Sequence, residues 1–199
     1  KKNPCRGFVL KNDNMTLQKE ILLPEEIQQL VATHFEGEKP EIHRAFIFGL
    51  YTGVRWCDTS QLTYRNVDYS TQTLRFQQQK TKDHSSRSWV IVPLNDTLIR
   101  LIGEPDNDSF DERIFKLPHY NICNLYLRKW VKAAGIKKKI TWHCARHSFA
   151  VNVLTKGANI KTVSSLLGHT SIKMTERYLH VVDLSLIHIS EPTRPEPIS

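Results

Sequence analysis

The decisive stretch of this sequence, residues 141–178, is TWHCARHSFAVNVLTKGANIKTVSSLLGHTSIKMTERY. Ile160, Val163, Leu166 and Leu167 recur at helical spacing, and Gly157 and Gly168 divide the stretch into three segments. Glycine is a common residue at the end of a helix, because it adopts the left-handed backbone conformation without strain. We therefore predict three consecutive helices, over residues 143–156, 160–167 and 171–181.

The first of these helices carries side chains that can bind phosphate. His143 and Arg146 are three residues apart, so they share one face and can contact the same phosphate group. Arginine suits this role because its planar guanidinium binds two phosphate oxygens and stays charged. His147 is four residues after His143 and shares part of that face. Taken alone, however, an H-x-x-R pattern is common, and a helix edge with surface charge explains it better.

Two further side chains follow. His169 comes directly after Gly168, which lets the chain turn sharply and direct the imidazole away from the preceding core face. Tyr178 is nine residues later and four after Met174, so by itself it is explained by packing against that methionine.

The rest of the chain predicts a mostly helical domain with one small antiparallel β-meander, an α+β fold. Pro24, Glu25 and Glu26 are suited to the start of a helix. Further helices are expected over 41–51, 57–62, 94–102 and 122–134, and strands over 66–68, 73–79 and 89–92. The apolar stripe of the 122–134 helix comprises Ile122, Tyr126, Leu127, Trp130, Val131 and Ala134, and Gly135 is expected just past its end.

The charge balance favours a polyanionic partner. The 199 residues are 40% hydrophobic and include 28 Lys and Arg against 20 Asp and Glu, a formal net charge of +8. A cationic protein attracts polyanions, of which nucleic acid is the commonest inside cells. A basic protein without such a partner remains the alternative.

The cysteines and the hydropathy predict a soluble, cytoplasmic protein. The four cysteines, Cys5, Cys57, Cys123 and Cys144, are scattered and form no C-x-x-C pair, which argues against a zinc cage or a disulfide framework. No apolar run approaches the roughly 18 residues of a membrane span, and we expect no membrane association.

The two ends of the sequence differ from its centre. We expect residues 1–20 to be a linker from an N-terminal DNA-binding domain and residues 21–183 to be the catalytic domain. Residues 184–194, LSLIHISEPTR, resemble the translation of a sequencing-library adapter, so the 184–199 tail is expected to be an artefact. The alternative is a genuine proline-rich tail, which would be disordered.

The residue types favour phosphoryl transfer without a metal or cofactor. Such a reaction needs a nucleophile, an acid for the leaving oxygen and cations over the non-bridging oxygens. A metal site would need clustered carboxylates, but the acidic residues occur mainly at helix starts and in the 104–112 loop. The sequence instead supplies arginine, histidine, lysine and tyrosine.

Five short strings in this order carry a family resemblance. They are TGVR at 52–55, KT at 80–81, HCAR at 143–146, LLGH at 166–169 and Tyr178. Together they resemble the tyrosine recombinases, the phage-type integrases and their relatives, over residues 23–183. The H-x-x-R, L-L-G-H and Tyr series is specific at these spacings, whereas KT alone is weak. The resemblance implies the catalytic-domain fold of that family.

The resemblance also implies how the scissile DNA phosphate is bound. Arg55 and Arg146 match the two catalytic arginines that hold it. His143 would bind the phosphate and assist proton transfer to or from Tyr178, and His169 would donate a hydrogen bond to the phosphate.

The remaining implied roles are those of the nucleophile that attacks the phosphate and of the acid that protonates the leaving oxygen. Tyr178 would be the nucleophile, and Lys80, on the β-hairpin, would be the general acid for the 5′ leaving oxygen, with Lys82 as the second candidate. A free phenol has a pKa of about 10, and the two arginines are expected to lower the cost of its ionisation. Asp58 matches an acidic position that orients neighbouring basic groups and is not catalytic.

The implied function is DNA recombination or integration on behalf of a mobile element. Cleavage gives a 3′-phosphotyrosine, and a second 5′-hydroxyl reverses the reaction, so two such exchanges pass through a Holliday junction. The implied partners are double-stranded DNA and three further copies of the protein, a homo-tetramer, with no small-molecule substrate. Two alternatives stay open: a type IB topoisomerase, which relaxes supercoils as a monomer, and a non-catalytic basic DNA-binding module.

Overall fold

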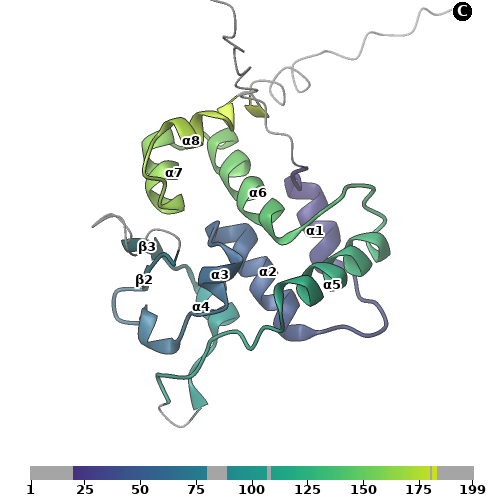
Figure 1. The fold of residues 1–199 in the computed structure, drawn as a ribbon, viewed down its shortest axis with the longest axis horizontal. Coiled ribbons are helices and arrows are strands. Elements are labelled where there is room, and N and C mark those ends of the chain that lie inside the picture. The colour runs from purple at the N-terminus through teal and green to yellow at the C-terminus, as the bar shows by residue number, and fades with distance from the viewer. Residues whose placement is uncertain (1–19, 80–88, 107–108, 180, 183–199) are drawn as a thin grey trace, which may run out of the picture.

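The computed structural model describes residues 20–79, 89–106, 109–179 and 181–182. Within these ranges the chain is mostly helical and carries one three-stranded antiparallel sheet, which confirms the predicted fold class (Figure 1). The elements in chain order are α1 Pro24–Ala32, α2 Pro40–Thr52, α3 Trp56–Thr59, the 3-10 helix η1 Tyr64–Asn66, β1 Val67–Asp68, β2 Thr73–Gln77, β3 Trp89–Pro93, α4 Asp96–Ile102, α5 Tyr120–Ala133, α6 Trp142–Thr155, α7 Ile160–Leu167 and α8 Lys173–Glu176.

The sheet is the predicted meander, with strand order β1-β2-β3. Leu74 of β2 pairs with Val92 of β3, and Phe76 pairs with Val90. These four side chains are buried, whereas the alternate positions are more exposed, as the period of two in a half-buried strand requires. The sheet therefore packs one face on the helical body.

Helices α2 and α6 form the centre of the body (Figure 1). They approach closely at Gly49, where an added Cβ would lie 3.6 Å from the Cβ of Ala145. Phe46 meets Trp142 edge to face, with 5.5 Å between the ring centroids. This packing brings the first turns of α6 to the end of α2, where the T-G-V-R string begins.

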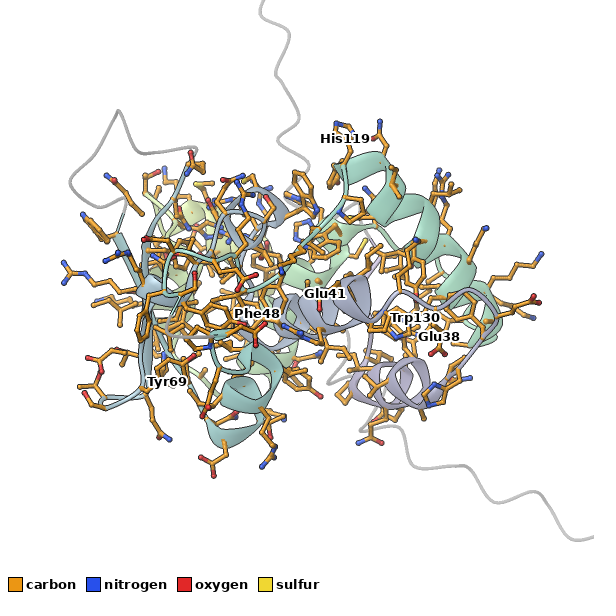
Figure 2. The ribbon with its side chains drawn as sticks, turned by 90° about the horizontal axis from the view of Figure 1, so that it is seen from below. Glu38, Glu41, Phe48, Tyr69, His119 and Trp130 are labelled. Atoms are coloured by element: carbon orange, nitrogen blue, oxygen red, sulfur yellow. The ribbon has the colours of Figure 1, made fainter. Side chains whose placement is uncertain are left out.

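Helices α1 and α5 cover another side of α2. Trp130 of α5 (labelled in Figure 2) stacks on His43 of α2 at 3.7 Å. It also donates a hydrogen bond from Nε1 to the carbonyl of Thr33 after α1, so it connects three helices. The predicted apolar stripe is wrong at one position. Ile122 is 48% exposed, and the neighbouring Cys123 is buried in its place.

Helices α6 and α7 and the segment after α8 enclose a second, smaller apolar cluster. It comprises Phe149, Ala150, Val151, Leu154, Val163, Leu167, Tyr178 and Val182. Tyr178 is thus anchored by packing against residues of other helices, whereas Met174, its expected partner, is 38% exposed.

Three predicted elements extend two or more residues past the C-terminal end that the structure gives them. The 171–181 helix is interrupted: α8 ends at Glu176, the amide of Tyr178 bonds a carbonyl three residues back, and helical residues resume at 179 and 181–182. The 57–62 helix likewise shortens to α3, and Gln61 makes the same kind of bond to Asp58. Strand β2 ends at Gln77, because the amide of Gln79 bonds the Asp58 carboxylate.

Candidate active site

Arg146 joins the three segments that carry the sequence motifs. Its side chain is buried on α6; Nη1 donates to the carbonyl of Gly53 at 2.9 Å and Nη2 to that of Leu167 at 2.6 Å. These bonds fix the plane of the guanidinium, and each Nη still carries a second hydrogen. Burial, followed by the charge of Arg55, lowers the pKa of Arg146 to about 9, so the group remains protonated at neutral pH.

Arg55 lies beside this guanidinium with an unsatisfied buried atom. Its side chain is 12% exposed, and Nη1 is 4.0 Å from Oδ2 of Asp58. Neither atom has a hydrogen-bond partner among the described residues. A buried N–H without an acceptor costs about 1–3 kcal/mol, so an anionic oxygen would bind favourably next to Arg55.

Asp58 connects Arg55 to the end of the sheet. Its Oδ1 accepts a hydrogen bond from the amide of Gln79 at 2.9 Å. Burial raises the pKa of this carboxyl, and the Gln79 amide and the two nearby arginines oppose that rise. The predicted general acid, Lys80, is the next residue; it lies outside the described residues, as does Lys82.

The turn after α7 directs His169 to the same region. Gly168 adopts the left-handed conformation with φ of 61°, and a Cβ there would lie 2.4 Å from the Gln78 side chain, so this turn requires glycine. His169 Nδ1 is 2.7 Å from the hydroxyl of Thr175. Burial, and then the charges of Arg146 and Arg55, lowers the pKa of His169 to about 3, so its imidazole is neutral at physiological pH.

Tyr178 makes a hydrogen bond that the sequence does not reveal. Its hydroxyl is 2.8 Å from Nδ1 of His147, and the exposed fractions of the two residues are only 2% and 7%. Burial raises the pKa of the phenol, while Arg146, Arg177 and Arg55 lower it by a smaller amount. The expectation that arginines favour the phenolate is therefore correct in direction, but burial outweighs them in the structure without DNA.

His143 extends this contact along α6. It is half-buried, and its ring meets that of His147 edge-on, with centroids 5.3 Å apart. The structure thus brings together five of the six predicted residues, Arg55, His143, Arg146, His169 and Tyr178. It adds His147, for which the only sequence signal is a position next to Arg146 on the face of His143.

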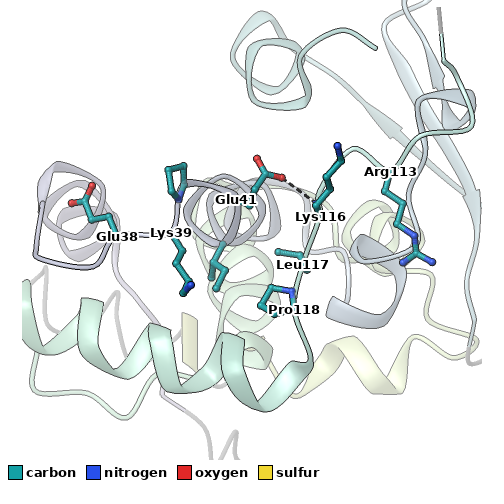
Figure 3. Close-up of a pocket in the computed structure, with 9 residues that line it drawn as sticks. Glu38, Lys39, Glu41, Arg113, Lys116, Leu117 and Pro118 are labelled. Carbon is teal, nitrogen blue, oxygen red and sulfur yellow. Dashed lines mark hydrogen bonds between the residues drawn. The ribbon is translucent and has the colours of Figure 1, made fainter. Parts of the chain in front are cut away.

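A hollow of about 380 Å³ lies beside His169, the one residue of this cluster that lines it. Its lining includes His169 and Gly168 together with Lys161, Ser165 and Trp89 from neighbouring elements. A larger groove of about 620 Å³ is shown in Figure 3. It is lined by Glu38–Ile42 and by Arg113 and Lys116–Pro118, at the start of α2, and is therefore at the opposite end of that helix from Gly53.

The described part of the chain has neither a metal-ligand cluster nor a membrane-spanning helix. No group of three or more His, Cys, Asp or Glu side chains there could hold a metal ion. No helix in those ranges has the length and apolar character required to cross a membrane.

The helical body, the small meander and the motif residues gathered between them define the catalytic-domain fold of the tyrosine recombinases. The chain belongs to the phage integrase family, whose model matches residues 20–184.

Individual relatives and solved structures are consistent with this family assignment. A tyrosine recombinase of Pseudothermotoga lettingae is 30% identical over 189 residues, which cover 91% of this chain and 63% of that protein. The catalytic domain of bacteriophage HP1 integrase superposes with a TM-score of 0.64 at 26% identity, covering 88% of this chain and 97% of that one. The Tn1549 transposon integrase, solved in complex with transposon right end DNA, gives a TM-score of 0.67 at 18% identity over 92% of this chain and 69% of that chain. The chain spans less than two thirds of the length of the first of these proteins.

Proposed function

We propose that this chain is the catalytic part of a site-specific DNA recombinase that cuts and rejoins double-stranded DNA through a 3′-phosphotyrosine. One observation carries the proposal: Arg146 bonds the carbonyls of Gly53, two residues before Arg55, and of Leu167, and its neighbour His147 contacts the Tyr178 hydroxyl at 2.8 Å. A phenol beside two arginines is suited to attack a phosphodiester, because the arginines stabilise the negative charge that develops on the phosphate.

In this proposal the two arginines bind the non-bridging oxygens of one phosphate. Arg146 is held in place by its two carbonyl bonds, and the buried Nη1 of Arg55 gains the acceptor that it otherwise lacks. His169 is neutral, and in the tautomer with its hydrogen on Nε2, Nδ1 accepts from the Thr175 hydroxyl. Its Nε2–H is then available to donate to the phosphate.

The chemical steps then follow from simple displacement. The Tyr178 hydroxyl gives its proton to an adjacent histidine as its oxygen attacks phosphorus, the bond to the 5′ oxygen breaks, and Lys80 protonates that oxygen. The phosphotyrosine conserves the energy of the phosphodiester, so a different 5′-hydroxyl can attack it and release the tyrosine. Exchange of one 5′-hydroxyl for another is strand exchange, the core of recombination and integration.

The partners of the whole protein are part of the proposal. We propose double-stranded DNA as the substrate and a homo-tetramer on that DNA as the working assembly, in the bacterial cytoplasm where such DNA is found. The net charge of +8 supports a polyanionic partner.

A selection for covalent adducts tests the proposal and identifies the target site in the same experiment. The full chain is incubated with a library of random double-stranded DNA, and DNA that remains attached after denaturation is sequenced. We expect one enriched sequence with the wild type and none with Tyr178→Phe. A binding module would retain DNA only before denaturation, and recovery of no adduct would contradict the proposal. A topoisomerase would relax supercoiled plasmid as a monomer without joining two sites.

A further inference from the structure

We infer that His147, in place of His143 to which the resemblance assigns proton transfer, is the general base of the proposed reaction and accepts the proton of Tyr178 as the tyrosine attacks DNA. The inference rests on the proposed function and concerns a residue that lies outside the five motif strings. Its basis is the 2.8 Å contact between Nδ1 of His147 and the Tyr178 hydroxyl. Geometry of this kind is the first requirement for a general base.

The burial of the pair makes a protein acceptor necessary. With exposed fractions of 2% and 7%, the tyrosine and the histidine are shielded from bulk water, and water is therefore poorly placed to take the phenolic proton. Tyr178 packs within the apolar cluster of Phe149, Leu167 and their neighbours. A phenol held in such surroundings loses its proton only to a group already in contact with it.

The protonation states are consistent with this role. When the proton of the neutral imidazole is on Nε2, Nδ1 has a lone pair that accepts from the phenol. During attack the O–H bond breaks, the proton moves to Nδ1, the phenol oxygen bonds to phosphorus, and the bond to the 5′ oxygen breaks. Lys80 gives a proton to that oxygen, so His147 gains the charge that the lysine loses. In rejoining, the imidazolium returns its proton to the departing tyrosine.

The surrounding charges set the conditions for this transfer. The titratable and charged groups around the His147–Tyr178 pair include His143 and Arg146 on α6, His169 after α7, Arg177 after α8, and Arg55 before α3. The cations oppose a further positive charge on His147. The additional negative charge of the phosphorane in the transition state offsets that opposition when DNA is bound.

The chain contains a matched control pair. His43 Nε2 is 2.8 Å from the hydroxyl of Tyr126, so a second histidine–tyrosine hydrogen bond of the same length exists on α2 and α5. This pair is part of the structural packing around Trp130. Loss of His43 should therefore affect stability without changing the rate of DNA cleavage by the folded protein.

The test compares His147→Asn, His147→Ala and His43→Asn in the full chain, using the DNA recovered by adduct selection. Asparagine presents an oxygen close to the position of Nδ1 but cannot take a proton, so it separates positioning from base catalysis. We expect both His147 variants to form the adduct about 10²-fold more slowly and to lose the rise in rate with pH that general-base catalysis predicts for wild type. His43→Asn should keep the wild-type rate and pH profile.

A second substrate distinguishes the base from the acid. DNA with sulfur in place of the bridging 5′ oxygen has a leaving group that needs no proton. We expect this substrate to restore cleavage by Lys80→Ala but not by His147→Asn. Wild-type behaviour of His147→Asn, in rate and pH profile, would overturn the inference while leaving the proposed function intact. If wild type formed no adduct at all, the proposed function and the inference about His147 would both be contradicted.

Discussion

Arg146 and Gly53, separated by 93 positions, are joined by a 2.9 Å hydrogen bond from the guanidinium to the carbonyl. This bond attaches the first half of α6 to the end of α2, and Arg55 follows only two residues after Gly53. The same side chain that is proposed to bind the phosphate therefore also positions the segment that supplies the second arginine.

Replacement of Arg146 should consequently damage both activity and stability. Arg146→Ala leaves the buried carbonyls of Gly53 and Leu167 without this donor, which should lower the free energy of unfolding by about 1–3 kcal/mol. Adduct formation should fall by at least about 10²-fold. Lys137→Ala, at an exposed position of the basic turn, is the control. Equal cleavage rates in the two variants would contradict the proposed site.

Gly168 should tolerate substitution far less than Gly157. Both have positive φ, 61° and 86°, so alanine is strained at either position by about 1 kcal/mol. A Cβ at 168 would also lie 2.7 Å from Val90 Cγ2, whereas at 157 it meets nothing within 4 Å. In urea unfolding, Gly168→Ala should lower the free energy of unfolding by about 1–3 kcal/mol more than Gly157→Ala does. Similar losses in both variants would show that the contact between this turn and the sheet is unimportant.

His169 should make the fold sensitive to acid. Its folded-state pKa of about 3 is below the ordinary value of 6.5, so the unfolded chain binds the extra proton first as pH falls. As the pH falls from about 6.5 to 3, this residue should therefore lower the free energy of unfolding. Above about pH 6.5 its contribution should not change with pH. Denaturant titrations at several pH values should show a flatter profile for His169→Gln than for wild type. Parallel profiles would mean that the imidazole is not shielded as described.

Asp58 should act mainly through its bond to Gln79. Asp58→Asn keeps an oxygen acceptor for the amide and removes a charge that burial disfavours, so its free energy of unfolding should remain within about 1 kcal/mol of wild type. Asp58→Ala leaves the Gln79 amide without its acceptor, so the free energy of unfolding should fall by about 1–3 kcal/mol. If the two variants unfolded at the same denaturant concentration, the hydrogen bond would contribute little.

Helical periodicity and glycine positions are sufficient to predict most of the fold. They identify α2, α7 and the meander, which bury an apolar face or alternate in burial, and the glycine at 157 marks the end of α6, which is buried on nearly all sides. They overestimate the helix before Tyr178, because the end of α8 depends on tight turns and on packing against α6 and α7. Ile122 departs from the prediction for a similar reason: an apolar residue at helical spacing is buried only if another element covers it.

The candidate site is predictable as a set of residue types but not as a set of contacts. The motif strings identify Arg146 and Tyr178, yet nothing local indicates that Arg146 bonds two carbonyls or that Tyr178 bonds His147. Those contacts depend on how α2, α6, α7 and the segment after α8 pack, which involves residues 31 and 93 positions apart. Histidine next to arginine on a helix is also common on ordinary surfaces, so no local signal selects His147.

The central claim is that the hydroxyl of Tyr178 attacks a DNA phosphorus atom. Proteolysis of the covalent complex, followed by mass spectrometry of the peptide that carries the nucleotide, tests it most directly. The account predicts a 3′-phosphate linkage on Tyr178 and no labelled peptide from Tyr178→Phe. A nucleotide attached to any other residue, or an adduct that persists in Tyr178→Phe, would contradict it.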